Sequence, residues 1–478
     1  MTAIWQPDLT QFQGPKYLAL SHALRDAVRT GDLTEGTRLP PVRELAWRLS
    51  ITPGTVARAY QIVTQEGLLE ATVGRGTFVA PHERRLGPIQ PMFNQGPLPE
   101  LRAQSLVDLR SAKLPDVGQT LALSAILTQM AGRLGEDHLD YPDSRREGPL
   151  RQAYADWLSN LAIGSFGADD IVLTLGGQNG LCIALQACLR GDRPSVLCEE
   201  LAYAGFRRAA RLNRADVVPV TLDEQGMIPE ALDAACRRHG SRIVCMTPDA
   251  QNPTTAAMSL ERRIALVKVA RAHDLQIIED NCFAVLGSAE FGNSDPGHAG
   301  PAIRALAPER TWFITSLSKS ISAGLRFGGI VCPTGLGDST RLVVQNTYFG
   351  LPRPIADIAM ALFQSGQAQK LRAQVQEVFN TRLDLALNIL GRHAIRWQRG
   401  LSFIWLPMPR GWRASTFARM AEAAGVLVRT ADEYALTDGR APNAIRVALS
   451  GAIPEADFIT ALTTLARLLD NPPDDLAV

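Results

Sequence analysis

Residues 311–328 read TWFITSLSKSISAGLRFG, and this stretch decides the fold of most of the chain. Its first four residues are apolar or β-branched and predict a buried strand. The strand runs into a Ser-rich turn ending at Lys319, whose amine could form an imine with an aldehyde. Three nearby side chains could bind a phosphate: Ser316, Ser318 and Arg326. Taken alone, S-x-S-K is a weak signal, because most such lysines are solvated surface groups.

Three other segments place polar groups at the ends of expected strands. Gly176-Gly177-Gln178-Asn179 opens a helix, whose first N–H groups and positive dipole end suit a phosphate. Asp280 ends an apolar run, and a buried carboxylate needs a partner, for which a protonated pyridine nitrogen would serve. Asn252 lies in an Asn-Pro turn and could donate to a phenolate oxygen. The alternative for the first segment is a plain strand–helix turn, and the alternative for the third is an ordinary Asn-Pro turn.

The region around these segments alternates short β-branched runs with helical patterns. Such alternation predicts an α/β domain with a mostly parallel sheet covered on both faces. The expected strands are Ile171–Leu175, Ser195–Cys198, Val217–Val220, Arg242–Thr247, Leu275–Glu279, Thr311–Thr315 and Gly329–Cys332, with helices such as Leu181–Leu189 and Leu260–His273 between them.

Composition limits the classes of protein to consider. At roughly 150 residues per domain, 478 residues suggest about two to four domains. A hydrophobic fraction of 46% excludes a mostly disordered chain. The net charge of +1 excludes a chain that is basic throughout, but not one small nucleic-acid-binding module.

Cysteine usage and hydropathy indicate the compartment. The seven cysteines form no CxxC pair or Cys/His cluster, so we expect free thiols in a reducing compartment and no metal site. Residues 1–9 lack an apolar core of signal-peptide length, and no uncharged apolar run of about 18 residues occurs. We therefore expect a soluble cytoplasmic protein.

The first 80 residues predict a separate, mainly helical module. Helices are expected over Tyr17–Thr30, over Leu39–Leu49, and from Pro53 to about Glu66, followed by a hairpin around Gly74-Arg75-Gly76. This is the order of a winged helix-turn-helix, in which the second helix of the pair enters the major groove of DNA. The candidate DNA contacts are Arg43, Thr52, Thr55, Arg58 and Arg75.

Charge alone does not establish that DNA is the partner. Residues 1–85 hold ten Lys/Arg against eight Asp/Glu. As the alternative to DNA contact, Arg43 and Arg58 would be solvated or paired with Glu44 and Glu66. A Pro-rich stretch over 81–106 predicts an extended linker. The expected domains are therefore 1–80, the linker 81–106, and 107–478 with a smaller α+β subdomain at about 355–478.

Both modules resemble known families. Residues 17–79, including GTRLPPVRELAWRLSITPGTVARAYQIVTQEGLLEATVGRGTFV, resemble the GntR-type winged-helix domain, although Pro53 and Gly54 stand where such domains often carry Arg and Thr. Residues 107–470 resemble the fold-type I pyridoxal phosphate enzymes, the class I/II aminotransferases, through the ordered motifs around Gly177, Tyr203, Asn252-Pro253, Asp280, Ser316-x-x-Lys319 and Arg326. The two modules in this order resemble the MocR/GabR subfamily of GntR-type regulators.

The second resemblance implies a role for each matching residue. Lys319 would hold pyridoxal phosphate as a Schiff base, Asp280 would pair with the ring nitrogen, and Asn252 would contact the ring oxygen. Tyr203 would stack on the ring, Tyr141 would cross into the neighbouring subunit's site, and Arg446 would clamp an α-carboxylate. The residues implied to hold the phosphate are Gly177, Gln178, Ser316, Ser318 and Arg326.

Three departures from the family pattern suggest weak or altered catalysis. Cys282 or Phe283 stands where a Tyr is expected after Asp280, so one hydrogen bond to the ring oxygen is lost. Arg146 stands where Gly is usual, with Gly148 close by, and Ala323-Gly324 replaces Pro-Gly.

The resemblance thus implies a homodimeric, pyridoxal-phosphate-dependent transcription regulator that binds operator DNA and senses an amine or amino acid, without physiological turnover. The alternatives are a working aminotransferase with an incidental N-terminal domain, and a scaffold that binds DNA and a partner protein without cofactor.

Overall fold

The computed structural model describes residues 5–9, 14–65, 68–72, 76–80, 106–191, 194–283, 300–436 and 441–472. The chain divides into two compact units, Met1–Pro91 and Met92–Val478, here called the N-terminal and C-terminal units. Each has its own buried apolar clusters. Of the predicted linker 81–106, residues 81–105 lie outside the described part of the chain, and so does Arg75 in the hairpin.

The N-terminal unit has the predicted order of elements. Helices α1 (Lys16–Thr30), α2 (Val42–Arg48) and α3 (Pro53–Gln65) precede an antiparallel hairpin of β1 (Leu69–Thr72) and β2 (Gly76–Val79). Helix α1 ends at Gly31, whose φ of 86° is left-handed and suits a residue without Cβ. One face of α3 is buried, at Val56, Ala59, Tyr60 and Val63.

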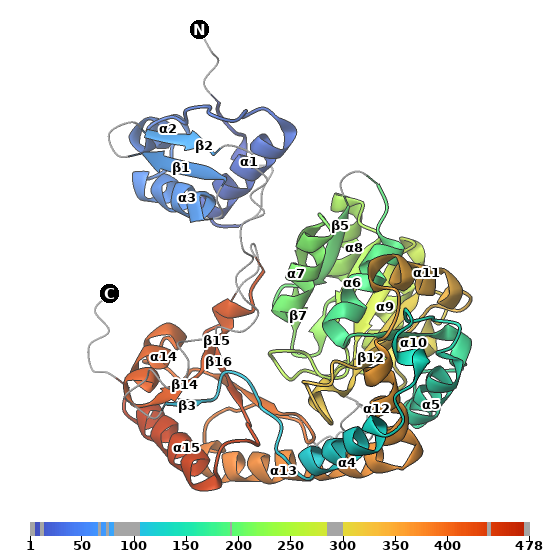
Figure 1. Cartoon of the computed structure of the whole chain (residues 1–478). Coiled ribbons are helices and arrows are strands. Elements are labelled where there is room, and N and C mark those ends of the chain that lie inside the picture. The colour runs from blue at the N-terminus through green and yellow to red at the C-terminus, as the bar shows by residue number, and fades with distance from the viewer. Residues whose placement is uncertain are drawn as a thin grey trace. The chain divides into compact units, whose positions relative to one another are not determined.

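A seven-stranded sheet with order β4-β12-β11-β10-β9-β5-β6 lies in the part of the C-terminal unit that bears the labels β5 and β12 in Figure 1. Six strands are parallel and β12 is antiparallel to both neighbours, so the predicted mostly parallel sheet is confirmed. The strands are β4 (Ile171–Thr174), β5 (Ser195–Glu199), β6 (Asp216–Val220), β9 (Ile243–Met246), β10 (Gln276–Asp280), β11 (Thr311–Ser316) and β12 (Gly328–Val331).

Helices cover both faces of this sheet, as the alternation predicts. Successive strand residues point to opposite faces, so Ile278 packs in one apolar cluster and Ile277 in another. The first cluster includes side chains of α6 (Gly177–Cys188), α7 (Ala204–Leu212) and α11 (Gly337–Tyr348), and the second those of α8 (Pro229–His239), α9 (Leu260–Ala272) and α10 (Ile303–Leu306). The sheet and these helices form the large subdomain, together with the hairpin β7 (Leu222–Asp223) and β8 (Gly226–Met227).

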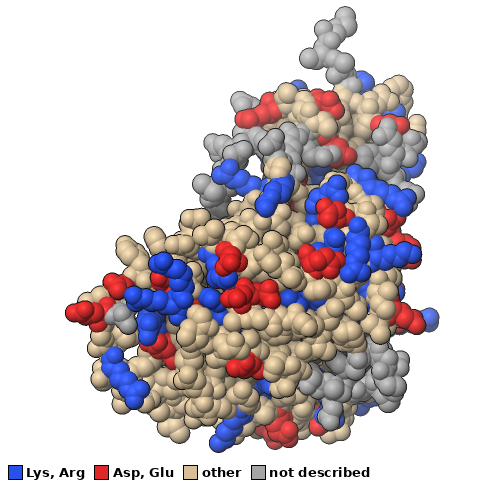
Figure 2. Space-filling view, turned by 90° about the vertical axis from the view of Figure 1, so that its right-hand side faces the viewer, with Lys and Arg blue, Asp and Glu red and all other residues tan. Residues whose placement is uncertain are grey.

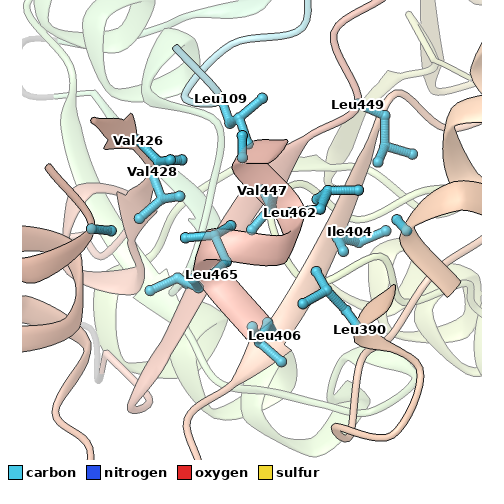
Figure 3. Close-up of a cluster of buried hydrophobic side chains, with 14 of the residues drawn as sticks. Leu109, Leu390, Ile404, Leu406, Val426, Val428, Val447, Leu449, Leu462 and Leu465 are labelled. Carbon is cyan, nitrogen blue, oxygen red and sulfur yellow. The ribbon is translucent and has the colours of Figure 1, made fainter. Parts of the chain in front are cut away.

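A small α+β subdomain follows. Strands β13 (Phe403–Pro407), β16 (Ala444–Ala448) and β15 (Arg429–Thr430) form an antiparallel sheet that packs with α13 (Gln367–Leu390), α14 (Ala414–Ala423) and α15 (Glu455–Asp470). Figure 3 shows Leu109, Ile404 and Leu462 meeting in its core. Leu109 comes from the other end of the unit, because β3 (Val107–Asp108) pairs with β14 (Val426–Leu427). The sequence pattern did not assign residues 107–109 to this subdomain.

Three further helices lie in the described part of the C-terminal unit, α4 (Gln119–Ala131), α5 (Gly148–Leu158) and α12 (Arg353–Gln364). One of them, α4, carries apolar side chains on the surface. On and after α4, large exposed side chains include Leu121, Leu127, Leu134, Leu139 and Tyr141, and Phe349 packs against the Tyr141 ring.

On the face shown in Figure 2, Lys and Arg lie among Asp and Glu. Within the described ranges, no helix combines the length and hydropathy of a membrane span.

Candidate functional site

The strand ends gather the predicted residues at one edge of the large sheet. Strands β4, β5, β9, β10 and β11 run in the same direction, so their carboxyl ends share one edge. Arg326 reaches this edge from the start of the antiparallel β12. The residues that lie at or follow these strand ends are Gly177, Tyr203, Asn252, Asp280 and Lys319.

Lys319 ends a short 3₁₀ turn, Leu317–Lys319, directly after β11. The Ser316 hydroxyl caps this turn by accepting from the Ser318 backbone N–H at 3.3 Å. Burial, and next the charge of Arg446, lower the pKa of Lys319. A lowered pKa increases the neutral, nucleophilic fraction of the amine, which imine formation requires.

Asp280 and Cys282 lie close to the amine of Lys319. Burial raises the pKa of Asp280, and its Oδ1 accepts from the Cys282 backbone N–H at 3.0 Å. Burial also raises the pKa of the Cys282 thiol well above its usual range, so the thiol stays neutral. Phe283 packs on Phe403 instead, with ring centroids 5.3 Å apart. Beside Lys319, Cys282 therefore lies on the side of Asp280, whereas Phe283 lies on the side of Phe403.

The start of α6, at Gly176, Gly177 and Gln178, is the predicted phosphate site and is here called the phosphate cradle. Gly176, with φ 83° and ψ 172°, caps the helix in a conformation essentially limited to glycine. A Cβ there would come within 2.8 Å of Arg326 Nη2, which donates to the Leu175 carbonyl at 2.9 Å. The Gln178 side chain donates to the Gly205 carbonyl at 3.1 Å, while its buried Oε1 has no partner among the described residues.

Asn252 and Tyr203 are the residues that the resemblance assigns to the cofactor ring. Asn252 is 5% exposed, and its buried Oδ1 finds no partner in the described part of the chain. Gly205, which sequence reasoning missed, lets the Tyr203 ring lie against the main chain, because a Cβ there would be 2.0 Å from Tyr203 Cε1. Such close contacts arise in three dimensions and leave no local sequence signal.

Glu199 is a second residue that sequence reasoning missed. It ends β5 with no exposed surface, and burial raises its pKa to about 7. Its Oε2 accepts from the Thr247 hydroxyl at 2.9 Å and from Gln251 Nε2 at 3.2 Å, next to Asn252. A carboxylate at the end of an apolar strand was the available signal, as it was for Asp280.

The structure also brings Arg446 to this edge, while Tyr141 lies apart from it. Arg446 on β16 is 7% exposed, and its guanidinium carbon lies 4.0 Å from the centroid of the Phe403 ring. Tyr141 is 78% exposed and contacts Phe349. An exposed position suits the role that the resemblance implies for Tyr141, in the site of a neighbouring subunit.

In the N-terminal unit, the start of α3 carries the candidate DNA contacts. Thr52 Oγ1 accepts from the Thr55 backbone N–H at 3.3 Å, as a helix cap does. Arg58 is exposed and lies 4.1 Å from the Tyr17 ring centroid. Arg43 is exposed on α2, whereas Glu44 pairs with Arg48 at 2.7 Å. Glu66, the other acid weighed as a partner, lies outside the described residues.

Comparison with known proteins identifies a family for each of the two units. Residues 105–465 match the aminotransferase class I and II family. The chain belongs to this family. Residues 16–79 match the bacterial regulatory proteins of the gntR family, so the predicted combination of the two domains is confirmed.

Relatives share this organisation over nearly their whole length. The chain is 28% identical to the uncharacterized HTH-type transcriptional regulator YdeF of Bacillus subtilis, covering 98% of this chain and 97% of the relative. It is 28% identical to the HTH-type transcriptional regulator TauR of Rhodobacter capsulatus, covering 94% and 96%. The chain is therefore a helix-turn-helix transcription regulator of the MocR/GabR type, as its two domains predict.

Solved aminotransferases share the fold of the C-terminal unit. The kynurenine aminotransferase of Pyrococcus horikoshii superposes with a TM-score of 0.66 at 21% identity, covering 77% of this chain and 91% of that one. LysN of Thermus thermophilus, complexed with N-(5'-phosphopyridoxyl)-L-leucine, gives 0.64 at 22%, covering 77% and 92%.

Family membership implies pyridoxal phosphate as the cofactor, and the residues present fit it. The buried Asn252 Oδ1 has no partner in the described chain, and turning this amide end over would present its N–H donors to a ring oxygen in its place. A glycine at position 176 lets the Arg326 guanidinium lie against the start of α6, where a Cβ would come within 2.8 Å of its Nη2. Lys319 supplies the amine that an aldehyde needs.

Proposed function

We propose that this regulator acts in the cytoplasm as a homodimer that binds operator DNA through α3 and senses an amine or amino acid at the edge of the large sheet. One observation carries this proposal. A lysine with a lowered pKa, a buried acid and a phosphate cradle lie together at one sheet edge, in a chain that also presents Arg58 on an exposed helix.

Each residue at the edge has a proposed task. Pyridoxal phosphate supplies an aldehyde that condenses with primary amines, and a ring that accepts electrons. Asp280 would balance a protonated ring nitrogen, Asn252 would bond the ring oxygen, and Tyr203 would cover one ring face. The phosphate would be held by Ser316, Ser318, Arg326 and the first N–H groups of α6, at Gly177 and Gln178.

The effector would act through the amine and carboxylate groups that Lys319 and Arg446 address. An incoming amine would free the Lys319 amine, and Arg446 would hold a carboxylate. The signal reaches DNA when the effector binds two arrangements of the dimer with different affinity. A two-fold dimer suits a repeated or palindromic operator.

A working aminotransferase is the second candidate. The nearly complete set Lys319, Asp280 and Arg446 favours it, whereas Cys282 in place of a tyrosine removes one hydrogen bond to the ring oxygen. The neutral Cys282 thiol gives no equivalent donor strength.

One paired experiment tests the two functions. The full chain is loaded with pyridoxal phosphate and titrated with amino acids and amines, and absorbance and mobility shift on the upstream DNA of the neighbouring operon are read at each step. We expect visible absorbance, and DNA binding that changes with at least one ligand. Rapid turnover of an amino acid with a keto acid, without sequence-selective DNA binding, would contradict the regulator function.

A further inference from the structure

The guanidinium of Arg446 has hydrogen-bond partners on one side only, and its other side is here called open in the sense that its N–H groups have no partner among the described residues. Its Nη1 donates to the Tyr434 hydroxyl at 2.9 Å and to the Arg110 carbonyl at 3.4 Å. Its Nε is buried and has no partner in the described residues, where no hydrogen bond from Nη2 is found either. Of the five N–H donors of this arginine, those along the Nε–Nη2 edge are therefore open.

An open Nε–Nη2 edge is suited to a carboxylate. Two parallel N–H groups of an arginine match the two oxygens of a carboxylate in a bidentate pair. The edge is also near the reactive amine. Phe403 lies 4.0 Å from Arg446 and 5.3 Å from Phe283, and the Phe283 ring centroid lies 5.7 Å from Lys319 Nζ. Arg446 and Lys319 thus flank the same pair of rings.

Tyr434 is itself held firmly. It is 7% exposed, and its carbonyl accepts from the Ala202 backbone N–H at 2.9 Å. The next residue, Ala435, forms a β-bridge with Leu201. A hydroxyl on such a fixed main chain can set the direction of the group that it binds.

We propose that Tyr434 is a positioning residue for carboxylate recognition. By holding Nη1 of Arg446, its hydroxyl turns the Nε–Nη2 edge toward the carboxylate of the effector. This inference rests on the proposed effector function and assigns the specificity for carboxylates to a pair, Arg446 with Tyr434, in place of Arg446 alone.

The test compares matched ligands on the full chain loaded with pyridoxal phosphate. Absorbance titrations use L-alanine with ethylamine, and 4-aminobutyrate with n-propylamine, so that the amine of each pair lacks only the carboxylate. Tyr434→Phe removes the hydroxyl and keeps the ring. Tyr60→Phe is the control, because Tyr60 is equally buried at 5% exposure and its hydroxyl donates to the Pro40 carbonyl in the other unit.

We expect wild type to bind at least one amino acid more tightly than its matched amine. Tyr434→Phe should reduce this preference about tenfold, as expected for the loss of a hydrogen bond to a charged group, and Tyr60→Phe should preserve it. An unchanged preference in Tyr434→Phe, or equal weakening of amine and amino acid, would overturn the positioning role while leaving the proposed function intact. A wild type that responds to none of the four ligands, or prefers neither amino acid, would instead overturn the proposed amino-acid sensing and this inference with it.

Discussion

Burial sets the protonation of the single residues around the sheet edge. It lowers the pKa of Lys319 and raises those of Asp280 and Glu199. In each case the neutral form is favoured, because desolvation disfavours the charged form. Burial thus shifts each group toward its neutral form, and a cationic ring nitrogen placed beside Asp280 would shift that acid back toward its carboxylate.

Lys319→Ala should abolish the visible absorbance of the loaded chain and the adduct that borohydride fixes. The substitution removes the amine that holds the cofactor, whereas the phosphate cradle remains. Lys268→Ala is the control, because Lys268 is exposed on α9. A borohydride-fixed adduct that persists at wild-type yield in Lys319→Ala would refute the assignment.

Glu199→Gln should change how stability depends on pH. The folded-state pKa of about 7 lies above the ordinary 4.5, so the stability that Glu199 contributes is present below pH 4.5 and is lost as pH rises through 7. The glutamine has no such loss. The free energy of unfolding of the variant should therefore rise relative to that of wild type between pH 5 and pH 8, by up to about 3 kcal/mol.

Urea-unfolding midpoints of both full chains, taken at several pH values across this range, measure the gain. Glu230→Gln, at an exposed position on α8, should run parallel to wild type. A difference between Glu199→Gln and wild type that is constant with pH would show that Glu199 does not titrate there.

At the level of elements, the turns after parallel strands place the chemistry. The strand and helix segments were predictable because their apolar periodicity is local. The Gly176, Asp280 and Lys319 turns were found for the same reason, since each directly follows an apolar run. Gly205, Tyr434 and the pairing of β3 with β14 were not, because each depends on a contact between distant segments.

Gly176→Ala should weaken binding of pyridoxal phosphate by at least about tenfold, because a Cβ would press on Arg326 in a backbone conformation that costs about 1–3 kcal/mol. Gly191→Ala is a matched control: its φ is also 83°, but a Cβ there meets nothing within 4 Å. Absorbance titration with the cofactor measures both. Similar weakening in the two variants would mean that backbone strain alone, and not the cradle, is responsible.

Arg58→Ala on α3 should weaken operator binding about tenfold and leave the visible absorbance unchanged. Arg48→Ala is the control, because Glu44 already neutralises Arg48 on α2. Mobility shifts at two salt concentrations measure the loss. If Arg58→Ala instead abolished cofactor binding, the separation of the two units would be wrong.

At the level of the whole molecule, the apolar surface on and after α4 supports a homodimer. Leu121, Leu139 and Tyr141 are 77%, 88% and 78% exposed in the single chain, and large apolar side chains exposed in this way are typical of protein interfaces. A second copy that covered it would also bring Tyr141 toward the neighbouring site.

If the proposed homodimer forms through this surface, Leu121→Glu should convert it to a monomer, because a carboxylate buried in an apolar interface lacks a partner. Sedimentation velocity of the full chain measures the state. Ile264→Glu, on α9 at 52% exposure, should remain dimeric. A dimer that survives Leu121→Glu unchanged would place the interface elsewhere, and a monomeric wild type would refute the homodimer.

The pairing of β3 with β14 has a mechanical consequence. Strand β3 starts at Val107, just after the connection from the N-terminal unit, and it is hydrogen-bonded to the small subdomain and not to the large sheet. The chain that follows the N-terminal unit is therefore first anchored on the small subdomain, the smaller of the two parts of the C-terminal unit. A rotation of the small subdomain against the large one on effector binding would therefore carry this anchor point with it.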